Sequence, residues 1–274
     1  MSILSVHNLS KRYAWRASGF KMKYKWAVDD VSFDIAPREI VAIVGESGSG
    51  KTTLARCLLR LIPADHGSVL FENQDIFTLD RSALRQLRPS MQMIFQHPGR
   101  ALNPRHTVGQ TLTEALQVHR DISETGCRAE ALRLLDRVGL NASYWHRHPS
   151  ELSGGQQQRV VIARALSTQP RFLIADEPTS SLDAMVRQKI MVLLDELTKA
   201  RHMTLLIITH DIRTASHYAN RIGVMQQGKL IEMQPTQELL SAPQHEYTHQ
   251  LIAHAFATPE TIDQHELALE RETQ

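Results

Sequence analysis

Residues 40–52 read Ile-Val-Ala-Ile-Val-Gly-Glu-Ser-Gly-Ser-Gly-Lys-Thr, an apolar pentapeptide that runs directly into a glycine-rich loop. The last eight residues match the pattern Gly-x-x-x-x-Gly-Lys-Ser/Thr, whose glycines let successive backbone N–H groups turn towards phosphate oxygens. A helix beginning near Lys51 would add the positive end of its dipole. Lys51 would supply a charge to the outer phosphates of a nucleotide, and Thr52 a hydroxyl to Mg²⁺. The candidate nucleotide-binding residues here are Gly45, Glu46, Ser47, Gly48, Ser49, Gly50, Lys51, Thr52 and Thr53.

Three further apolar runs have the length of strands and end at polar residues. Met91–Phe95 precedes Gln96, Phe172–Ala175 precedes Asp176 and Glu177, and Thr204–Thr209 precedes His210. Short, nearly continuous apolar runs separated by helical patterns predict an α/β fold with a mostly parallel sheet covered on both faces. Ligands of such sheets bind at the carboxyl ends of the strands, and each of these polar residues falls at such an end.

Two adjacent carboxylates, Asp176 and Glu177, follow one of these strands. An aspartate in that place can hold the coordination shell of Mg²⁺, and the next carboxylate can orient and deprotonate an attacking water molecule. Acidic residues are common at strand ends, so the pair indicates nucleotide hydrolysis only in combination with the phosphate loop.

A second candidate phosphate site is the sequence Leu-Ser-Gly-Gly-Gln at Leu152–Gln156, at the start of a helix expected over Gln157–Ser167. The hydroxyl of Ser153 and the backbone amides at a helix start can bind a phosphate group. The loop at residues 45–52 already supplies the phosphate site for one nucleotide, so this second helix start needs another role. It has one if it closes over the nucleotide bound to another subunit.

With these motifs in this order, residues 3–235 resemble the ATPase subunits of ABC (ATP-binding cassette) transporters, whose signature is Leu-Ser-Gly-Gly-Gln. The resemblance implies ATP hydrolysis with Mg²⁺ by a head-to-tail dimer, in which two ATP molecules lie between a phosphate loop and the opposing signature. The signature residues concerned are Ser153, Gly154, Gly155 and Gln156.

The same resemblance assigns roles to single residues. Catalysis would depend on Glu177, Lys51 and His210, the last as the switch residue that contacts the γ-phosphate. Tyr13 would stack on adenine, Gln96 would touch magnesium and sense the membrane partner, and Ser180–Asp183 would link the two active sites. The expected magnesium ligands are Thr52, Gln96 and Asp176.

The chain divides by pattern into a phosphate-loop NTPase domain at residues 1–235 and a polar C-terminal extension at 236–274. Within the domain, the first 35 residues predict short strands of an antiparallel side sheet. A helical subdomain is expected at about 98–156, where Thr111–Val118 and Arg128–Val138 have amphipathic patterns. The basic and aromatic segment Arg16–Lys25 predicts a solvated hairpin loop, with contact to a membrane or partner as the alternative.

The composition is that of an ordinary soluble protein, with 42% hydrophobic and 22% charged residues. The 31 Lys and Arg residues against 29 Asp and Glu residues do not produce the concentrated positive charge of a general nucleic-acid binder. No apolar run approaches the ~20 residues that span a bilayer, and the N-terminus lacks a secretory signal pattern. We therefore expect a peripheral protein on the cytoplasmic face of the inner membrane, recruited by another protein.

Three segments are similar to the oligopeptide, dipeptide and nickel importer branch of the family: Phe95–Pro98, Ala101–Arg105 and Ser241–Thr248. The sequence departs from that branch at His97, where Asp is usual, and at Glu246, where Pro is usual. Many members bind an iron–sulfur cluster through cysteines near the C-terminus. The only cysteines here are Cys57 and Cys127, so we expect no cluster.

The resemblance further implies an importer that takes up peptides, with a second homologous or identical ATPase subunit and two integral membrane permease subunits. An external solute-binding protein would act indirectly, and no nucleic acid would be involved. Nickel or a metal chelate is the alternative cargo. The sequence barely constrains this choice, because other subunits of the complex select the cargo. A non-transport role on nucleic acid or the ribosome is the remote alternative. It is disfavoured because the chain has one cassette and leaves no room for a long coiled coil between Lys51 and Ser153.

Overall fold

Two sheets form the frame of the protein. The computed structural model describes residues 2–16, 22–119, 123–180 and 182–256. The large sheet has the order β10-β9-β3-β8-β7-β6, with β10 (Lys229–Pro235), β9 (Arg221–Gln226), β3 (Ile40–Val44), β8 (Thr204–Thr209), β7 (Phe172–Asp176) and β6 (Met91–Ile94). The small sheet has the order β2-β1-β4-β5, with β2 (Met22–Ile35), β1 (Leu4–Arg16), β4 (His66–Phe71) and β5 (Gln74–Asp75).

The pairing of the strands confirms the predicted fold class. In the large sheet the strands from β9 to β6 pair in parallel, and only β10 at the edge is antiparallel to its neighbour. The small N-terminal sheet is antiparallel throughout. The predicted strands at residues 40–44 and 204–209 have the observed bounds, and those at 91–95 and 172–175 differ by one residue at one end.

Strand β3 is apolar at every position because both of its faces are buried. Ile40, Ala42 and Val44 pack into the core shared with the helices on one side of the sheet. Val41 and Ile43 pack into a second core on the other side, between the two sheets. Burial on both faces is the usual reason for a continuous apolar run in a parallel strand.

Helix α1 (Lys51–Leu58) lies in this second core and contacts both sheets. Its side chains Leu54, Ala55, Cys57 and Leu58 are fully buried there. The helix is therefore held on several sides by strands of both sheets.

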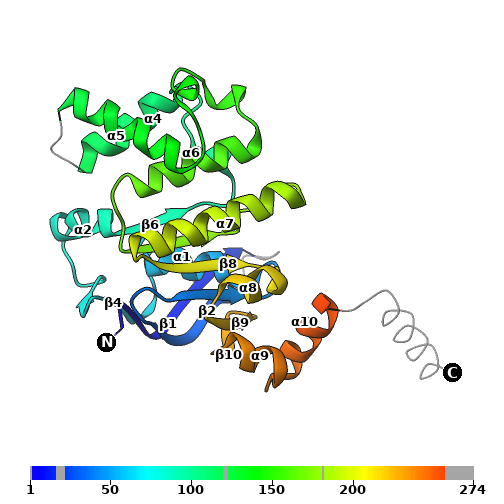
Figure 1. The fold of residues 1–274 in the computed structure, drawn as a ribbon. Helices are drawn as coiled ribbons and strands as arrows, with labels where there is room; N and C mark the ends of the chain where they lie inside the picture. Colours follow the sequence, from blue (N-terminus) through cyan, green and yellow to red (C-terminus); the bar gives the residue numbers. More distant parts are fainter. Residues whose placement is uncertain (1, 17–21, 120–122, 181, 257–274) are drawn as a thin grey trace.

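The segment predicted as a helical subdomain is helical and lies on the opposite side of the large sheet from α1 (Figure 1). It contains α3 (Pro98–Ala101), α4 (Val108–His119), α5 (Glu124–Arg137), the 3₁₀ turns η2 (Ala142–Tyr144) and η3 (Pro149–Glu151), and α6 (Gly154–Leu166). The remaining helices are α2 (Arg81–Leu87), the 3₁₀ turn η1 (Arg88–Ser90), α7 (Ala184–Arg201), α8 (Ile212–Tyr218), α9 (Thr236–Ser241) and α10 (Glu246–Phe256). None of the helices in the described residues is long and apolar enough to cross a membrane.

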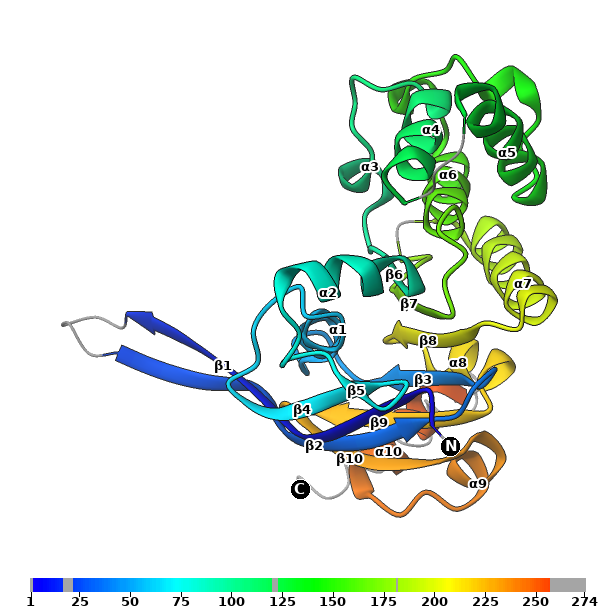
Figure 2. The ribbon, with the colours of Figure 1, turned by 90° about the vertical axis from the view of Figure 1, so that its left-hand side faces the viewer.

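The N-terminal hairpin differs from its prediction. Of the loop expected at Arg16–Lys25, the described residues are strand, because β1 continues to Arg16 and β2 begins at Met22 (Figure 2). Aromatic side chains favour extended backbone and pair across strands. The guanidinium of Arg12 lies 5.1 Å from the ring centre of Tyr24 and supports this pairing. Residues 17–21 of the predicted loop lie outside the described residues.

The segment after Pro235 is not a plain polar tail. It forms α9 and α10, and the side chain of Leu239 is fully buried in the same core as the helical subdomain. Tyr247, at the start of α10, is 9% exposed in that core. Helix α9 contributes one buried hydrophobic side chain, Leu239, and α10 adds Tyr247 with the partly buried Leu251, Ile252 and Ala255. The sequence analysis missed this packing because both helices are short. Residues 257–274 lie outside the described part of the chain.

We expect Leu239→Ala to lower the free energy of unfolding by about 2–5 kcal/mol, because it opens a cavity in a packed core. Urea denaturation of the full chain measures this change. Leu61→Ala is the matched control: its side chain is 43% exposed, and we expect a change within about 0.5 kcal/mol. Equal effects of the two substitutions would show that α9 is not part of the folded core.

Candidate active site

The glycine-rich loop between β3 and α1 requires glycine at two positions. Gly45 has φ +150° and Gly50 has φ +110°, which L side chains rarely adopt. A Cβ atom at Gly45 would overlap the carbonyl oxygen of Met225, and one at Gly50 would overlap that of Ala27. The loop therefore lies tightly against β9 and β2, and its backbone can make this turn only without side chains there.

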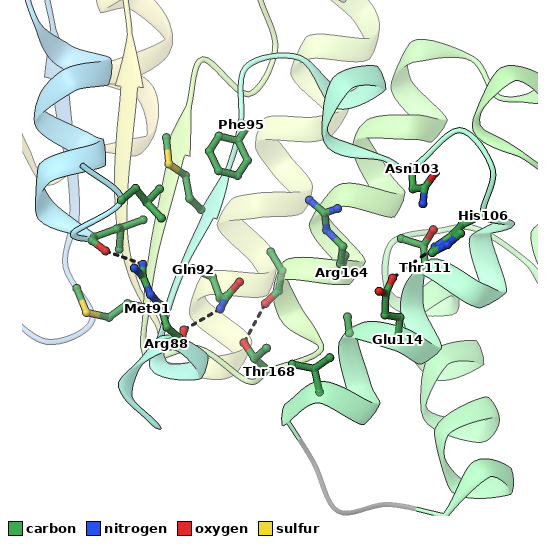
Figure 3. Close-up of a pocket in the computed structure, with 16 residues that line it drawn as sticks. Arg88, Met91, Gln92, Phe95, Asn103, His106, Thr111, Glu114, Arg164 and Thr168 are labelled. Atoms are coloured by element: carbon green, nitrogen blue, oxygen red, sulfur yellow. Dashed lines mark hydrogen bonds and ion pairs between the residues drawn. The ribbon is translucent and has the colours of Figure 1, made fainter. Parts of the chain in front are cut away.

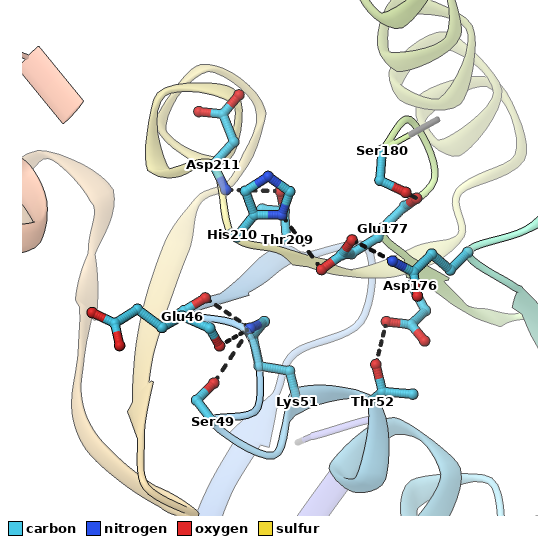
Figure 4. Close-up of polar contacts among 12 residues, drawn as sticks. Glu46, Ser49, Lys51, Thr52, Asp176, Glu177, Ser180, Thr209, His210 and Asp211 are labelled. Carbon is cyan, nitrogen blue, oxygen red and sulfur yellow. Dashed lines mark hydrogen bonds and ion pairs between the residues drawn. The ribbon is translucent and has the colours of Figure 1, made fainter. Parts of the chain in front are cut away.

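The ammonium group of Lys51 lies at the centre of this loop (Figure 4). It donates to the carbonyl oxygens of Gly45 at 2.7 Å and Glu46 at 2.8 Å, and it lies 3.3 Å from the hydroxyl of Ser49. Burial lowers the pKa of Lys51, while the carboxylates of Glu177 and Asp176 act in the opposite direction. Lys51 is thus a buried positive charge that faces carboxylates across the site.

The first turn of α1 offers backbone donors beside this charge. The N–H of Leu54 is the first to bond within the helix, to the carbonyl of Gly50 at 2.9 Å. The N–H groups of Lys51, Thr52 and Thr53 precede it, and a helix start leaves such groups without intrahelical acceptors. Together with the loop they form an arrangement suited to a phosphate anion.

Thr52 and Asp176 supply oxygen atoms that fit a magnesium ion. The hydroxyl of Thr52 donates to Asp176 Oδ1 at 3.1 Å, across the gap between α1 and β7. Burial raises the pKa of Asp176, and the hydrogen bond from Thr52 opposes that shift. Mg²⁺ prefers oxygen ligands and commonly takes only one or two from the protein, with nucleotide phosphates and water completing its shell. Consistently, no cluster of three or more His, Cys, Asp or Glu side chains in the described residues is placed to hold a metal ion.

Glu177 follows β7 and contacts residues at the ends of β6 and β8. Its φ of 44° is a left-handed backbone conformation, and its N–H donates to the carbonyl of Ile208 in β8 at 2.8 Å. Its Oε2 accepts from Gln96 Nε2 at 2.7 Å, and its Oε1 lies 3.4 Å from His210 Nδ1. Strained backbone of this kind persists where the surroundings hold it, and it is common at functional sites. The turn places the carboxylate within hydrogen-bond distance of Gln96, and Figure 4 shows its contact with His210.

This arrangement is suited to hydrolysis of a bound nucleotide. The phosphate donors, the magnesium-type oxygens and Glu177 all lie at the carboxyl edge of the large sheet. Glu177 is partly buried and can accept a proton from a water molecule. His210 has a side chain that is 53% exposed, so it can reach a ligand in front of the sheet.

The signature residues Ser153–Gln156 make a different set of contacts. The hydroxyl of Ser153 accepts from the N–H of Gln156 at 3.3 Å, and the side chain of Gln156 accepts from the N–H of Ser153 at 2.9 Å. This capping box starts α6 at Gly154, three residues before the predicted start. Gln156 also donates to the hydroxyl of Tyr144 at 3.0 Å. Ser153 and Gly154 are exposed, and no hydrogen bond in the described residues joins Ser153–Gln156 to the phosphate loop.

Two other predicted features lie at the periphery of this cluster. The side chain of Tyr13 is 45% exposed on the hairpin, with the ammonium of Lys11 at 5.9 Å from its ring centre. Its stacking on adenine stays a prediction. The segment Ser180–Asp183 follows Glu177 closely: Ser180 donates to the carbonyl of Glu177 at 3.3 Å, and Asp183 caps α7. Ser181 lies outside the described residues.

The sequence analysis missed one contact with the loop. The backbone N–H of Glu46 donates to the hydroxyl of Tyr247 at 3.2 Å. Tyr247 belongs to the segment Ser241–Thr248, which resembles an element of the importer branch, but nothing in that pattern connects it with residue 46. The only available signal was an aromatic residue with a hydroxyl in a segment that is otherwise polar.

Comparison with known proteins places this site in a family. The family model described as ABC transporter matches residues 28–180. The probable peptide ABC transporter ATP-binding protein y4tS of Sinorhizobium fredii is 43% identical over 256 residues, which cover 93% of this chain and 72% of the relative. The oligopeptide transport ATP-binding protein OppF of Bacillus subtilis is 44% identical over 229 residues, covering 83% of this chain and 75% of the relative.

A solved structure supports the same assignment. The dimeric, post-hydrolysis state of the ATP-binding cassette MJ0796, bound to ADP and Pi, has a TM-score of 0.76 and 30% sequence identity. The match covers 85% of this chain and 98% of that chain. The chain described here belongs to the ABC transporter family. It is an ATP-binding subunit with ATPase activity, which confirms the resemblance found in the sequence.

We expect Glu177→Gln to bind ATP as the parent does and to hydrolyse it about 10²–10⁴-fold more slowly, because an amide cannot accept the proton of water. The substitution keeps an oxygen acceptor for Gln96, so the local structure should persist. Steady-state phosphate release and nucleotide binding measure the two effects. Glu196→Gln, an exposed change on α7, is the control and should retain parental turnover. Near-parental turnover of Glu177→Gln would remove Glu177 from this role.

Proposed function

We propose that this chain is an ATPase subunit of an importer that moves peptides through membrane permease subunits. The observation that carries the proposal is its 43% and 44% identity, over most of the chain, to proteins named for peptide and oligopeptide transport. The segments Phe95–Pro98, Ala101–Arg105 and Ser241–Thr248 agree with that branch. Nickel or a metal chelate is the alternative cargo. The place of action is the cytoplasmic face of the cell membrane.

The described residues suggest how the chain hydrolyses ATP. Lys51 and the N–H groups at the start of α1 bind the outer phosphates. Thr52 and Asp176 would hold Mg²⁺, and the amide oxygen of Gln96 is free to join them because its nitrogen bonds Glu177. When bound, the ion neutralises charge that develops on the phosphate oxygens. Glu177 orients and deprotonates the attacking water, and His210 approaches the γ-phosphate from the exposed side.

The proposed active site is shared between two ATPase subunits. The signature residues Ser153–Gln156 are folded as a helix start, and the first-turn N–H groups of α6 have no intrahelical acceptors. They belong to the helical subdomain, and none bonds the phosphate loop of its own chain. A second subunit turned head to tail would bring them to the open side of a bound ATP. Each nucleotide then lies between one loop and the partner's signature.

A groove beside Gln96 is our candidate contact for a membrane subunit (Figure 3). It has a volume of about 430 Å³ and lies between the end of α1, strand β6 and helices α4 and α6. Its lining includes Leu61, Met91, Phe95, Val118, Arg88 and Glu114. Phe95 is 36% exposed and directly precedes Gln96, which donates to Glu177. A docked segment that displaces Phe95 would therefore also move Gln96, whose side chain bonds the carboxylate of Glu177.

The proposal also divides the chain. Residues 1–235 are the ATPase domain, with the helical subdomain at about 98–156 inserted in it. Residues 236–274 are an extension of the importer branch.

Cargo is tested by transport in cells. We expect cells that carry Glu177→Gln in place of the parent chain to lose uptake of a radiolabelled tripeptide and to keep uptake of ⁶³Ni. The reason is that the membrane subunits need ATP hydrolysis to reset. Loss of nickel uptake with intact peptide uptake would assign the alternative cargo. Normal uptake of both would contradict an importer role for either.

The shared site is tested by mixing two defective chains. Ser153→Arg should fold and bind ATP through its own Lys51 but fail to hydrolyse it, because the bulky charge blocks the partner's nucleotide. Lys51→Ala should also be inactive, because its own loop lacks the charge that binds the outer phosphates although its signature residues are intact. A mixture of the two chains pairs one intact loop with one intact signature and should restore up to one working site per dimer.

The mixing experiment assumes that the chain pairs with a second copy of itself. If the natural partner is a different ATPase subunit, the two substitutions are placed on opposite chains of that pair. Normal hydrolysis by Ser153→Arg, both as an isolated chain and in the full complex, would contradict a shared active site.

A further inference from the structure

The phosphate loop is hydrogen-bonded to the C-terminal extension. The hydroxyl of Tyr247, the second residue of α10, accepts from the backbone N–H of Glu46 at 3.2 Å. These residues are 201 positions apart in the sequence. Glu46 is the second residue of the loop, so a side chain from the extension contacts the nucleotide site directly.

This contact fixes a peptide unit that Lys51 also uses. The N–H of Glu46 and the carbonyl of Gly45 belong to the same planar peptide. The N–H is bound to Tyr247, and the carbonyl accepts from the ammonium of Lys51 at 2.7 Å. A rotation of this peptide would break both bonds at once. The orientation of the Tyr247 hydroxyl is therefore coupled to the position of the lysine that binds phosphate.

Tyr247 is itself held in place by buried contacts. Its ring packs in the main core and is 9% exposed. The turn before it is bound to Glu232 of β10, whose carboxylate is buried and accepts from the N–H of Gln244 at 2.8 Å and of His245 at 3.2 Å. The N–H of Tyr247 donates to His245 Nδ1 at 3.1 Å. A carboxylate that accepts two backbone donors is a rigid support.

The Cα atom of Gly45, at the start of the same peptide, is also closely packed. Gly45 lies directly against the carbonyl of Met225 in β9, which leaves no room for a Cβ atom. Strand β9 pairs with β10, the strand that carries Glu232. The peptide between Gly45 and Glu46 is thus held between β9 and the start of α10, and both supports belong to one hairpin and its extension.

We propose that Tyr247 is a positioning residue for ATP binding, which holds the first peptide of the phosphate loop so that Lys51 meets the outer phosphates. The inference deepens the ATPase function and rests on it. It gives the C-terminal extension a direct effect on nucleotide affinity. Tyr247 touches neither the reacting atoms nor the phosphate; it acts through the backbone of Glu46.

The test is Tyr247→Phe in the full chain, which removes only the hydroxyl. One hydrogen bond contributes about 0.5–1.5 kcal/mol net, which corresponds to a change of about 2- to 10-fold. We expect the Kd and the KM for ATP to rise by up to that factor, with a smaller change in kcat and only a slightly lower unfolding midpoint, because the same bond also stabilises the chain without ATP. Amide hydrogen exchange at Glu46 should become faster. A role in stability alone would lower the midpoint and leave KM unchanged.

A second variant separates positioning from general packing. Glu232→Gln weakens the support of the turn without touching the hydroxyl, and it should raise KM for ATP in the same direction. In the double variant, KM should be no higher than in Tyr247→Phe alone, because Glu232 acts through a hydroxyl that is already absent. Additive increases in KM would contradict this coupling.

Tyr218→Phe is the matched control. It removes a hydroxyl from a half-buried tyrosine at the end of α8, beside Ile40 at the opposite end of β3 from the loop. We expect its KM and its hydrogen exchange at Glu46 to be parental. The inference is overturned if Tyr247→Phe keeps the parental Kd, KM and exchange rate, or if Tyr218→Phe changes them equally. Because ATP binding by the chain is the readout, a failure of the peptide-import proposal would leave this result interpretable.

Discussion

The buried charge of Lys51 is the constraint on which the catalytic edge of this protein depends. An ammonium group removed from water is stable only where acceptors or opposite charges surround it. The carbonyls of the glycine-rich loop supply the acceptors, and Asp176 and Glu177 supply the charge. To bring the carbonyls inward the loop adopts backbone angles available to glycine, and it lies against β2 and β9 so closely that no side chain fits.

The parallel sheet brings the remaining groups to this charge. Strands β3, β6, β7 and β8 run in the same direction, so residues that follow them meet at one edge although they are far apart in the chain. Apolar cores on both faces hold the strands in register. Glu177 then connects three of these strand ends by contacts to Gln96, His210 and the carbonyl of Ile208. The positions of these side chains therefore follow from the parallel direction of the strands and from the burial of both faces of the sheet.

Helices outside the large sheet carry the remaining features of the candidate site. The signature helix α6 begins with exposed residues and has its own capping interactions, so its first turn is formed without a ligand. A groove between the sheet and the helical subdomain lies next to Gln96. The C-terminal helices reach the phosphate loop from the opposite side through Tyr247. Of these three features, only Tyr247 makes a hydrogen bond to the phosphate loop in the described residues.

The amino-acid sequence by itself determined the class of this protein and predicted the residues of its candidate site. The loop at residues 45–52 and the signature at 152–156 are local patterns whose chemistry follows from residue type and spacing. The buried strands were also recognisable, because a strand covered on both faces must be apolar throughout. The predicted roles of the single site residues, from Lys51 and Glu177 to Tyr13 and the signature residues, remain predictions.

Only the tertiary structure decided the contacts between segments that are distant in the chain. The extent of the N-terminal hairpin depended on cross-strand packing of Arg12 on aromatic rings, which residue-by-residue patterns do not contain. The packing of α9 and α10 rested on two buried hydrophobic side chains, Leu239 and Tyr247, with Leu251, Ile252 and Ala255 partly buried beside them. The bond between Tyr247 and Glu46 joins residues 201 positions apart. The packed core brings Tyr247 and Glu46 together, and no local sequence pattern contains that information.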